Sequence, residues 1–171
     1  AAKAAEAAKA ADAAKAAEKW GATDVVLLPL YPQFSTTTTA SSLLAWRKAS
    51  KLPASTICCY PAGLKFAQAH ADAILKTWRD AGSPSSPRLL FSAHGLPQSI
   101  VARGDPYQWQ VEQGAAAIRK LLPPEWDIRI CYQSRVGPMK WIGPSTEEEV
   151  HRAGKEGVGV LISPIAFVSE H

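Results

Sequence analysis

Short apolar runs alternate with helical segments along most of the chain. Five runs have the length and apolar content of strands that are buried on both faces of a parallel sheet: 25–30, 56–60, 88–92, 128–132 and 157–162. Four intervening segments have helical apolar spacing or helix caps: 35–50, 63–80, 106–122 and 146–153. Repeated strand–loop–helix units predict an α/β fold, in which helices flank a mainly parallel sheet through right-handed crossovers.

Local signals set the ends of two of these helices. Thr146 followed by Glu149 has the pattern of a capping box, and predicts that a short helix begins there. The pair Pro123-Pro124 stops the helix before it, because proline has no backbone N–H to donate. The segment 82–87 consists of Gly, Ser and Pro and predicts a loop.

The first 19 residues follow a different pattern, an Ala-Ala-charge repeat with 12 Ala, 4 Lys and 3 acidic residues. Alanine favours a helix, and opposite charges three residues apart are neighbours on its surface. Because a period of three drifts around a turn of 3.6 residues, the charges wind around the helix and leave no broad apolar stripe. The sequence predicts a helix here, and favours a substituted, idealised or linker-like segment over a natural core helix.

Composition narrows the class of protein. With 171 residues, the chain is one domain or one large fragment of a bigger protein. Its net charge of +4 is too small to imply nucleic-acid binding, which usually needs a clustered basic face. Three cysteines, an odd number, argue against a disulfide-stapled secreted scaffold and indicate a reducing compartment. The chain has neither a long apolar span nor a signal-peptide pattern, so we expect no membrane-spanning segment.

Polar residues follow each predicted strand, where ligands bind in open parallel sheets. His94 lies between the end of one strand and a Gly-Leu-Pro turn, and His171 holds a similar place after the last strand. Two histidines that converge from adjacent strands could hold a metal or share a proton, because imidazole titrates near neutrality. Hydrogen bonding within the turn is the alternative for His94. His70 and His151 lie within predicted helices, and we assign them ordinary surface or packing roles.

Aromatic and sulfur side chains add two expectations. Four rings near the strand ends could form the floor of a site for a flat aromatic ligand, or could pack between loops. They are Tyr31, Phe34, Trp141 and Phe167. Cys58 and Cys59 have no His or acid at metal-ligand spacing, so we expect both to be buried small apolar side chains. The sequence contains no phosphate-binding P-loop, dinucleotide-binding glycine motif, C-x-x-C, H-E-x-x-H or G-x-S-x-G motif.

Five linked motifs are specific enough to identify a family resemblance. They are 30–35 (LYPQFS), 91–97 (FSAHGLP), 104–107 (GDPY), 132–146 (YQSRVGPMKWIGPST) and 164–171 (PIAFVSEH). Their order and spacing resemble ferrochelatase from Gly21 to the last residue, and the stretch 36–42 (TTTTASS) resembles bacterial members of that family. The resemblance implies a lyase of haem biosynthesis that inserts Fe²⁺ into a porphyrin, with the macrocycle held between two similar Rossmann-like lobes.

The resemblance also implies roles for individual residues. His94 matches the family's histidine that faces the porphyrin centre, where it accepts a pyrrole proton, delivers the metal, or does both. Candidates for gripping the ring are Tyr31 and Trp141, candidates for binding a propionate are Ser134 and Arg135, and accessory candidates are Glu170 and His171. Fe²⁺ is the substrate and a transient ligand of His94, and no permanent cofactor is implied.

Partners and location follow from the same resemblance. We expect porphyrin and ferrous iron as partners, no nucleic acid, and a cytoplasmic location with peripheral membrane contact left open. An iron–sulfur cluster is not supported, because no C-terminal cysteine cluster is present. Oligomeric state stays open, and so does the choice between protoporphyrin IX and coproporphyrin III.

The chain also departs from the family pattern. It stops at His171, whereas the family continues with Ile-Glu-Thr, whose Glu handles protons or metal, and the family's opening strand is absent. We therefore expect a chain that is incomplete at both ends, with an Ala/Lys/Glu-rich helix at 1–19, the remainder of the first lobe at 20–84 and a partial second lobe at 85–171. Two alternatives stay open: a non-catalytic porphyrin-binding or structural fragment, and a cobalt chelatase of related fold.

Overall fold

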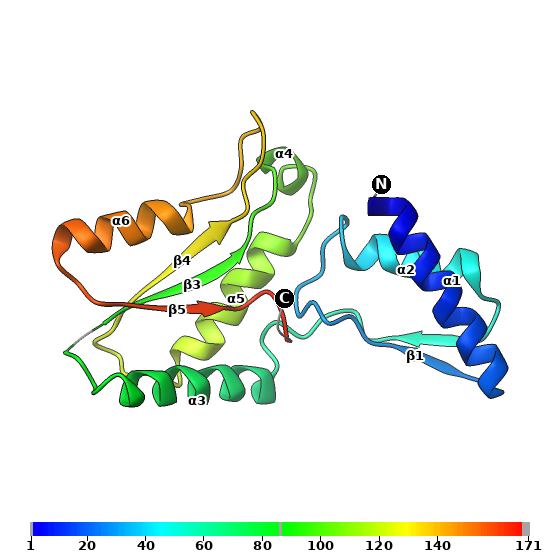
Figure 1. Cartoon of the computed structure of the whole chain (residues 1–171), viewed down its shortest axis with the longest axis horizontal. Helices are drawn as coiled ribbons and strands as arrows, with labels where there is room; N and C mark the ends of the chain where they lie inside the picture. The colour runs from blue at the N-terminus through cyan, green and yellow to red at the C-terminus, as the bar shows by residue number, and fades with distance from the viewer. Residues whose placement is uncertain (1, 86, 169–171) are drawn as a thin grey trace. The chain divides into compact units, whose positions relative to one another are not determined.

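The computed structural model describes residues 2–85 and 87–168, with side chains from residue 8 onward. The chain divides into two compact units, Ala1–Cys59 and Tyr60–His171. Each unit combines helices with parallel strands (Figure 1), so the predicted α/β fold with parallel sheets flanked by helices is confirmed.

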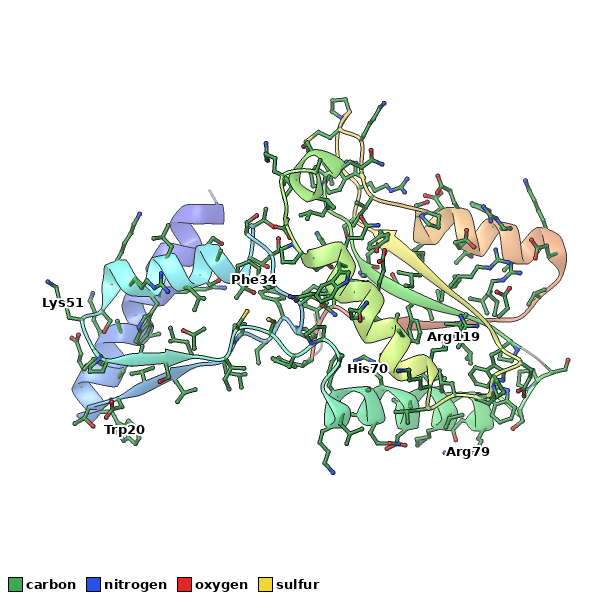
Figure 2. The ribbon with its side chains drawn as sticks, turned by 180° about the vertical axis from the view of Figure 1, so that it is seen from behind. Trp20, Phe34, Lys51, His70, Arg79 and Arg119 are labelled. Atoms are coloured by element: carbon green, nitrogen blue, oxygen red, sulfur yellow. The ribbon has the colours of Figure 1, made fainter. Side chains whose placement is uncertain are left out.

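The first unit joins a pair of helices to a short parallel ladder. Its elements are α1 (Ala2–Trp20), β1 (Val25–Leu27), α2 (Thr39–Ala49) and β2 (Ala54–Thr56). β1 pairs with β2, α1 packs against α2, and Ala14 and Trp46 are buried. The helix predicted over the Ala-rich repeat is confirmed, and Trp20 at its end is 87% exposed (Figure 2).

The second unit contains a parallel sheet with strand order β4-β3-β5. The strands are β3 (Arg88–His94), β4 (Asp127–Gln133) and β5 (Val160–Pro164). The helices are α3 (Leu64–Asp80), α4 (Gln98–Val101), α5 (Tyr107–Arg119) and α6 (Thr146–Glu156). Each strand follows a helix or a long loop, as parallel neighbours require.

Alternate residues of β3 face different helices. Leu89, Phe91 and Ala93 belong to the core that also contains the buried faces of α3 and α5. Ser92, one step out of phase, contacts Thr146 of α6 through its hydroxyl. The period of two along a strand therefore places α3 and α5 on one face of the sheet and α6 on the other (Figure 1).

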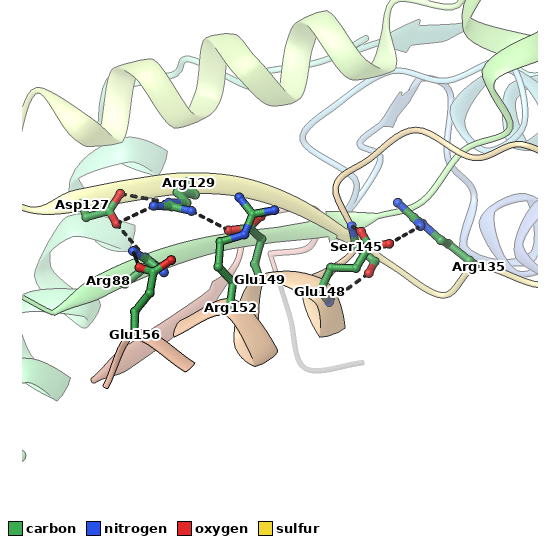
Figure 3. Close-up of polar contacts among 9 residues, drawn as sticks. All are labelled: Arg88, Asp127, Arg129, Arg135, Ser145, Glu148, Glu149, Arg152 and Glu156. Atoms are coloured by element: carbon green, nitrogen blue, oxygen red, sulfur yellow. Dashed lines mark hydrogen bonds and ion pairs between the residues drawn. The ribbon is translucent and has the colours of Figure 1, made fainter. Parts of the chain in front are cut away.

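An ion-pair network fastens α6 to the starts of β3 and β4 (Figure 3). Arg88, only 4% exposed, donates to Asp127 Oδ2 and to Glu156 Oε2, each at 2.6 Å. Arg129 joins Asp127 to the buried Glu149 through contacts of 3.1 Å. The Arg129 hydrogen bond, and then that of Arg88, hold the pKa of Asp127 below its usual range. This network stabilises the edge of the sheet opposite to the carboxyl ends of the strands.

The predicted strand 56–60 is wrong in position, because β2 ends at Thr56 and its three residues are exposed. Cys58 lies beyond the ladder and is exposed, and Cys59 is half-buried, so the prediction that both are buried is also wrong. A ladder of three residue pairs cannot cover side chains that run past its end. The two sulfur atoms lie 2.7 Å apart, and the hydrogen bond with Cys59 raises the pKa of Cys58 to about 11.

The helix predicted to be capped by Thr146 has its cap one residue earlier. Ser145 Oγ accepts a hydrogen bond from the Glu148 N–H at 3.1 Å, and the Glu148 carboxylate accepts one from the Ser145 N–H at 2.7 Å. The Thr146 hydroxyl instead contacts Ser92 Oγ at 2.9 Å and Cys131 Sγ at 3.3 Å. Three consecutive glutamates make the sequence pattern fit either residue, and contacts with the sheet select Ser145.

The expected lobe boundary at 84/85 and the division into compact units fall at different places. α3 groups with Tyr60–His171 because its buried residues Ala67, Ala71 and Ile74 belong to the core of that unit. The assignment of 20–84 and 85–171 to two lobes stays a prediction.

Candidate functional site

A pocket of about 650 Å³ lies in the second unit, at the carboxyl edge of its sheet. The register pairs His94 with Gln133 and Ser92 with Pro164, so the three strands end together. The lining residues come from the strand ends, the segment after β5 and one face of α3: Phe66, Ala69, His70, Ala73, His94, Gln133, Ser134, Pro164, Phe167 and Val168. This is the edge at which the sequence predicts a ligand site.

His94 is the last residue of β3, and its side chain is exposed to the pocket. Behind it, Tyr107 of α5 is buried. Burial raises the pKa of Tyr107, and the backbone of His94 beside the hydroxyl partly offsets that rise. The Tyr107 phenol therefore stays protonated and packs as a neutral support behind the histidine.

The turn after His94 is paired with the loop after β4. Gly95 N–H donates to the Gln133 carbonyl at 2.7 Å, Ile142 N–H to the Leu96 carbonyl at 3.0 Å, and Gln98 N–H to the Lys140 carbonyl at 2.9 Å. Pro97 and Trp141 form an antiparallel bridge between these hydrogen bonds.

The pairing places the Trp141 ring against Gly95, where an added Cβ would meet Trp141 Cε3 at 3.2 Å. The buried Trp141 Nε1 has no acceptor among the described residues. The Trp141 ring therefore lies against the residue that follows His94, although 47 positions separate Trp141 from His94 in sequence.

Ser134 and Arg135 follow β4 directly, and only the first lines the pocket. Ser134 has a φ of 62°, a left-handed conformation that is uncommon outside glycine and that turns the chain out of the strand. The Arg135 guanidinium donates to the Ile142 carbonyl at 3.2 Å and lies 3.6 Å from the Glu148 carboxylate. Arg135 thus braces its own loop against α6, and its contact with a propionate stays a prediction.

The remaining predicted site residues lie elsewhere. Tyr31 belongs to the first unit, in the loop after β1, and is half-buried. Its grip on a porphyrin stays a prediction. Glu170 and His171 lie outside the described residues. Of the four rings proposed as a floor, Phe167 lines the pocket.

His70, to which the sequence assigned an ordinary surface or packing role, lines the pocket. It projects from α3 (Figure 2) within the face formed by Phe66, Ala69 and Ala73, at the spacing i, i+3, i+4, i+7. Its Nδ1 lies 3.5 Å from Ser163 Oγ, and burial lowers its pKa. Helical spacing can place these residues on one face, but it does not reveal that the face lies against β5.

Within 2–85 and 87–168, no three His, Cys, Asp or Glu side chains come close enough to form a metal-binding group. In the same part of the chain, no helix is long and apolar enough to cross a membrane.

Comparisons with known proteins identify the family of the chain. The model of the ferrochelatase family matches residues 2–171. The chain is 61% identical to a ferrochelatase of Hyphomonas neptunium over 154 residues, which is 90% of this chain and 43% of that protein. It is 61% identical to one of Phenylobacterium zucineum, covering 86% of this chain and 44% of that protein. It is 46% identical to a ferrochelatase of Rickettsia bellii, covering 90% of this chain and 43% of that protein.

The chain therefore spans a little under half the length of the curated relatives that it matches. The family model covers all of the chain except its first residue, and it includes the strand end that carries His94. The chain belongs to the ferrochelatase family.

Proposed function

We propose that the protein to which this chain belongs inserts ferrous iron into a porphyrin, and that His94 faces the metal. One observation carries this proposal: in a chain of the ferrochelatase family, His94 ends β3 inside a pocket that Ser134 and Phe167 also line. An imidazole on a strand end is held by the sheet yet open to a ligand, as a group that meets a substrate must be.

The chemistry requires a base. Insertion replaces two pyrrole N–H bonds with bonds from nitrogen to the metal, so two protons leave and no electron is transferred. A neutral imidazole at His94 accepts a proton or binds Fe²⁺ during transfer, because its ring nitrogen has one available lone pair. Tyr107 behind His94 offers the dication no anionic oxygen, since burial raises the pKa of the phenol and keeps it neutral.

Other residues are candidates for orienting the porphyrin. The Trp141 ring, fixed against Gly95 next to His94, is one candidate for gripping the macrocycle, and Tyr31 is a second. Ser134 provides a hydroxyl at the pocket wall for a propionate. Arg135 can add a bidentate contact with a carboxylate if its guanidinium turns from Ile142 and Glu148.

We infer a cytoplasmic location for this protein, with peripheral contact to a membrane. The membrane contact is supported by Val136 and Met139 in the loop after β4, which are 71% and 54% exposed. Exposed apolar side chains on one loop favour contact with an apolar surface.

Metal insertion measured with protoporphyrin IX and with coproporphyrin III tests the proposal. In the enzyme that contains this segment, His94→Ala should reduce Fe²⁺ or Zn²⁺ insertion by about a hundredfold or more, because the proton acceptor is lost. His151→Ala, a change on the exposed face of α6, should leave the rate unchanged.

Full activity of His94→Ala would contradict the role given to this histidine. A shift of the porphyrin absorption band without any metal insertion would instead favour a porphyrin-binding protein. Faster insertion of Co²⁺ than of Fe²⁺ would favour a cobalt chelatase.

A further inference from the structure

His70 and His94 reach the same pocket from different elements. His70 projects from the second turn of α3, and His94 from the end of β3. On the pocket face of α3 the other lining residues are Phe66, Ala69 and Ala73, so His70 is the one titratable side chain that this helix brings to the pocket wall. Both imidazoles therefore belong to the lining of one pocket.

The His70 ring is held in a fixed orientation. Its Nδ1 makes a long hydrogen bond of 3.5 Å with the hydroxyl of Ser163, which is 7% exposed within β5. The Phe66 ring packs edge-on against the imidazole, with centroids 4.5 Å apart and planes at 70°. When one ring nitrogen is engaged in this way, the other is the nitrogen that can bind a ligand.

The surroundings keep the His70 imidazole neutral. Burial lowers the pKa of His70, so the uncharged ring predominates at neutral pH. A neutral imidazole is a good ligand for first-row divalent cations, and a protonated one is not.

We propose that His70 is a second nitrogen ligand for the divalent metal ion in this pocket, and that Ser163 positions its ring. This inference rests on the proposed function and adds a residue that binds the metal ion before insertion. Two imidazoles, with the side-chain oxygen of Gln133 in the same lining, form a sparse ligand set. A sparse set releases its ion readily, as suits an ion that is a substrate.

Metal binding without porphyrin tests this inference separately from catalysis. Co²⁺ is titrated into the 171-residue chain at pH 7.5 and followed by its visible absorption. His70→Phe keeps an aromatic ring beside Phe66 but removes the nitrogen, and should weaken Co²⁺ binding by about tenfold or more. Ser163→Ala should cause a smaller loss, and His151→Ala, the matched histidine control on α6, should bind as the unchanged chain does.

A second measurement excludes a purely structural role. On addition of Zn²⁺, the side-chain ¹⁵N resonances of His70 should shift, and those of His151 should not. If His70→Phe does not fold, as judged by circular dichroism, His70→Gln replaces it in the titration.

The outcomes separate this inference from the proposed function. Equal Co²⁺ affinity of the His70 variant and the unchanged chain, or His70 resonances unmoved by Zn²⁺, would overturn the role of His70 even where His94→Ala abolishes insertion. Conversely, weaker Co²⁺ binding in the His70 variant would support the second ligand even where His94→Ala still inserts metal.

Discussion

At Gly95 the fold accommodates a hydrogen atom but not a methyl group. An ideal Cβ there would lie 2.8 Å from the Gln133 carbonyl oxygen and 3.2 Å from the Trp141 ring. The carbonyl cannot move aside freely, because it accepts the Gly95 N–H at 2.7 Å. The residue after His94 is therefore restricted by close packing between two loops, not by an unusual backbone angle.

Gly95→Ala should lower the free energy of unfolding by about 1–3 kcal/mol, since overpacking forces backbone groups apart. Gly154→Ala is the matched control, because that glycine lies in α6 with nothing within 4 Å of an added Cβ. The control should be neutral or stabilising by up to about 1 kcal/mol, as alanine favours helices. Urea denaturation followed at 222 nm measures both, and equal stability of the two variants would refute the packing argument.

At the scale of single elements, α6 is defined by its two ends. Its start is closed by the reciprocal hydrogen bonds of Ser145 and Glu148, and its end by Gly157, which has a left-handed φ of 66°. Glu156, in its last turn, is paired with the buried Arg88. The helix is thus fixed at both termini and holds the loop after β4 at one end.

Ser145→Ala should destabilise the chain by about 1 kcal/mol, because the Glu148 N–H loses its acceptor. Ser145→Asp should retain most of the stability, since a carboxylate also caps a helix start. Thermal unfolding of the two variants side by side provides the measurement. The capping argument fails if the aspartate variant loses as much stability as the alanine variant.

Some features of the fold and the site can be predicted from the local sequence, and others depend on contacts with residues far away in the chain. The run Arg88–Ser92 is apolar enough to identify a buried strand, and His94 is identified by its position two residues past that run, where β3 ends. His70 could not be identified in this way, because its role depends on Ser163, 93 residues away. The cap at Ser145 could not be separated from Thr146, because only contacts with Ser92 and Cys131 distinguish them.

At the scale of the whole molecule, the two units differ in their internal support. The second unit buries a continuous apolar core between its sheet and the α3–α5 pair. In the first unit, β1 and β2 pair over three residues each, and Val26, Leu28 and Ile57 around this ladder are exposed. A two-stranded ladder has little stability of its own.

Hydrogen exchange should therefore proceed at different rates in the two units. Backbone amides of β3, which is paired on both sides, should exchange slowest, and amides of β1 and β2 should exchange at least about a hundredfold faster. Mass spectrometry of peptides from a deuterium time course resolves the two sets. Similar protection of β1 and β3 would show that the first unit is as stable as the second.

The pairing of 96–98 with 140–142 has a consequence for ligand binding. Separate loops each lose conformational freedom when a ligand contacts them, at roughly 1–2 kcal/mol per ordered residue. Here backbone hydrogen bonds already join the turn after His94 to the segment that carries Trp141. Much of that entropy is lost during folding, so a flat ligand that stacks on the indole, as proposed above, would meet an imidazole already held in place. The affinity of such a ligand then depends mainly on the contacts that the ligand makes, and little on the cost of ordering these two loops.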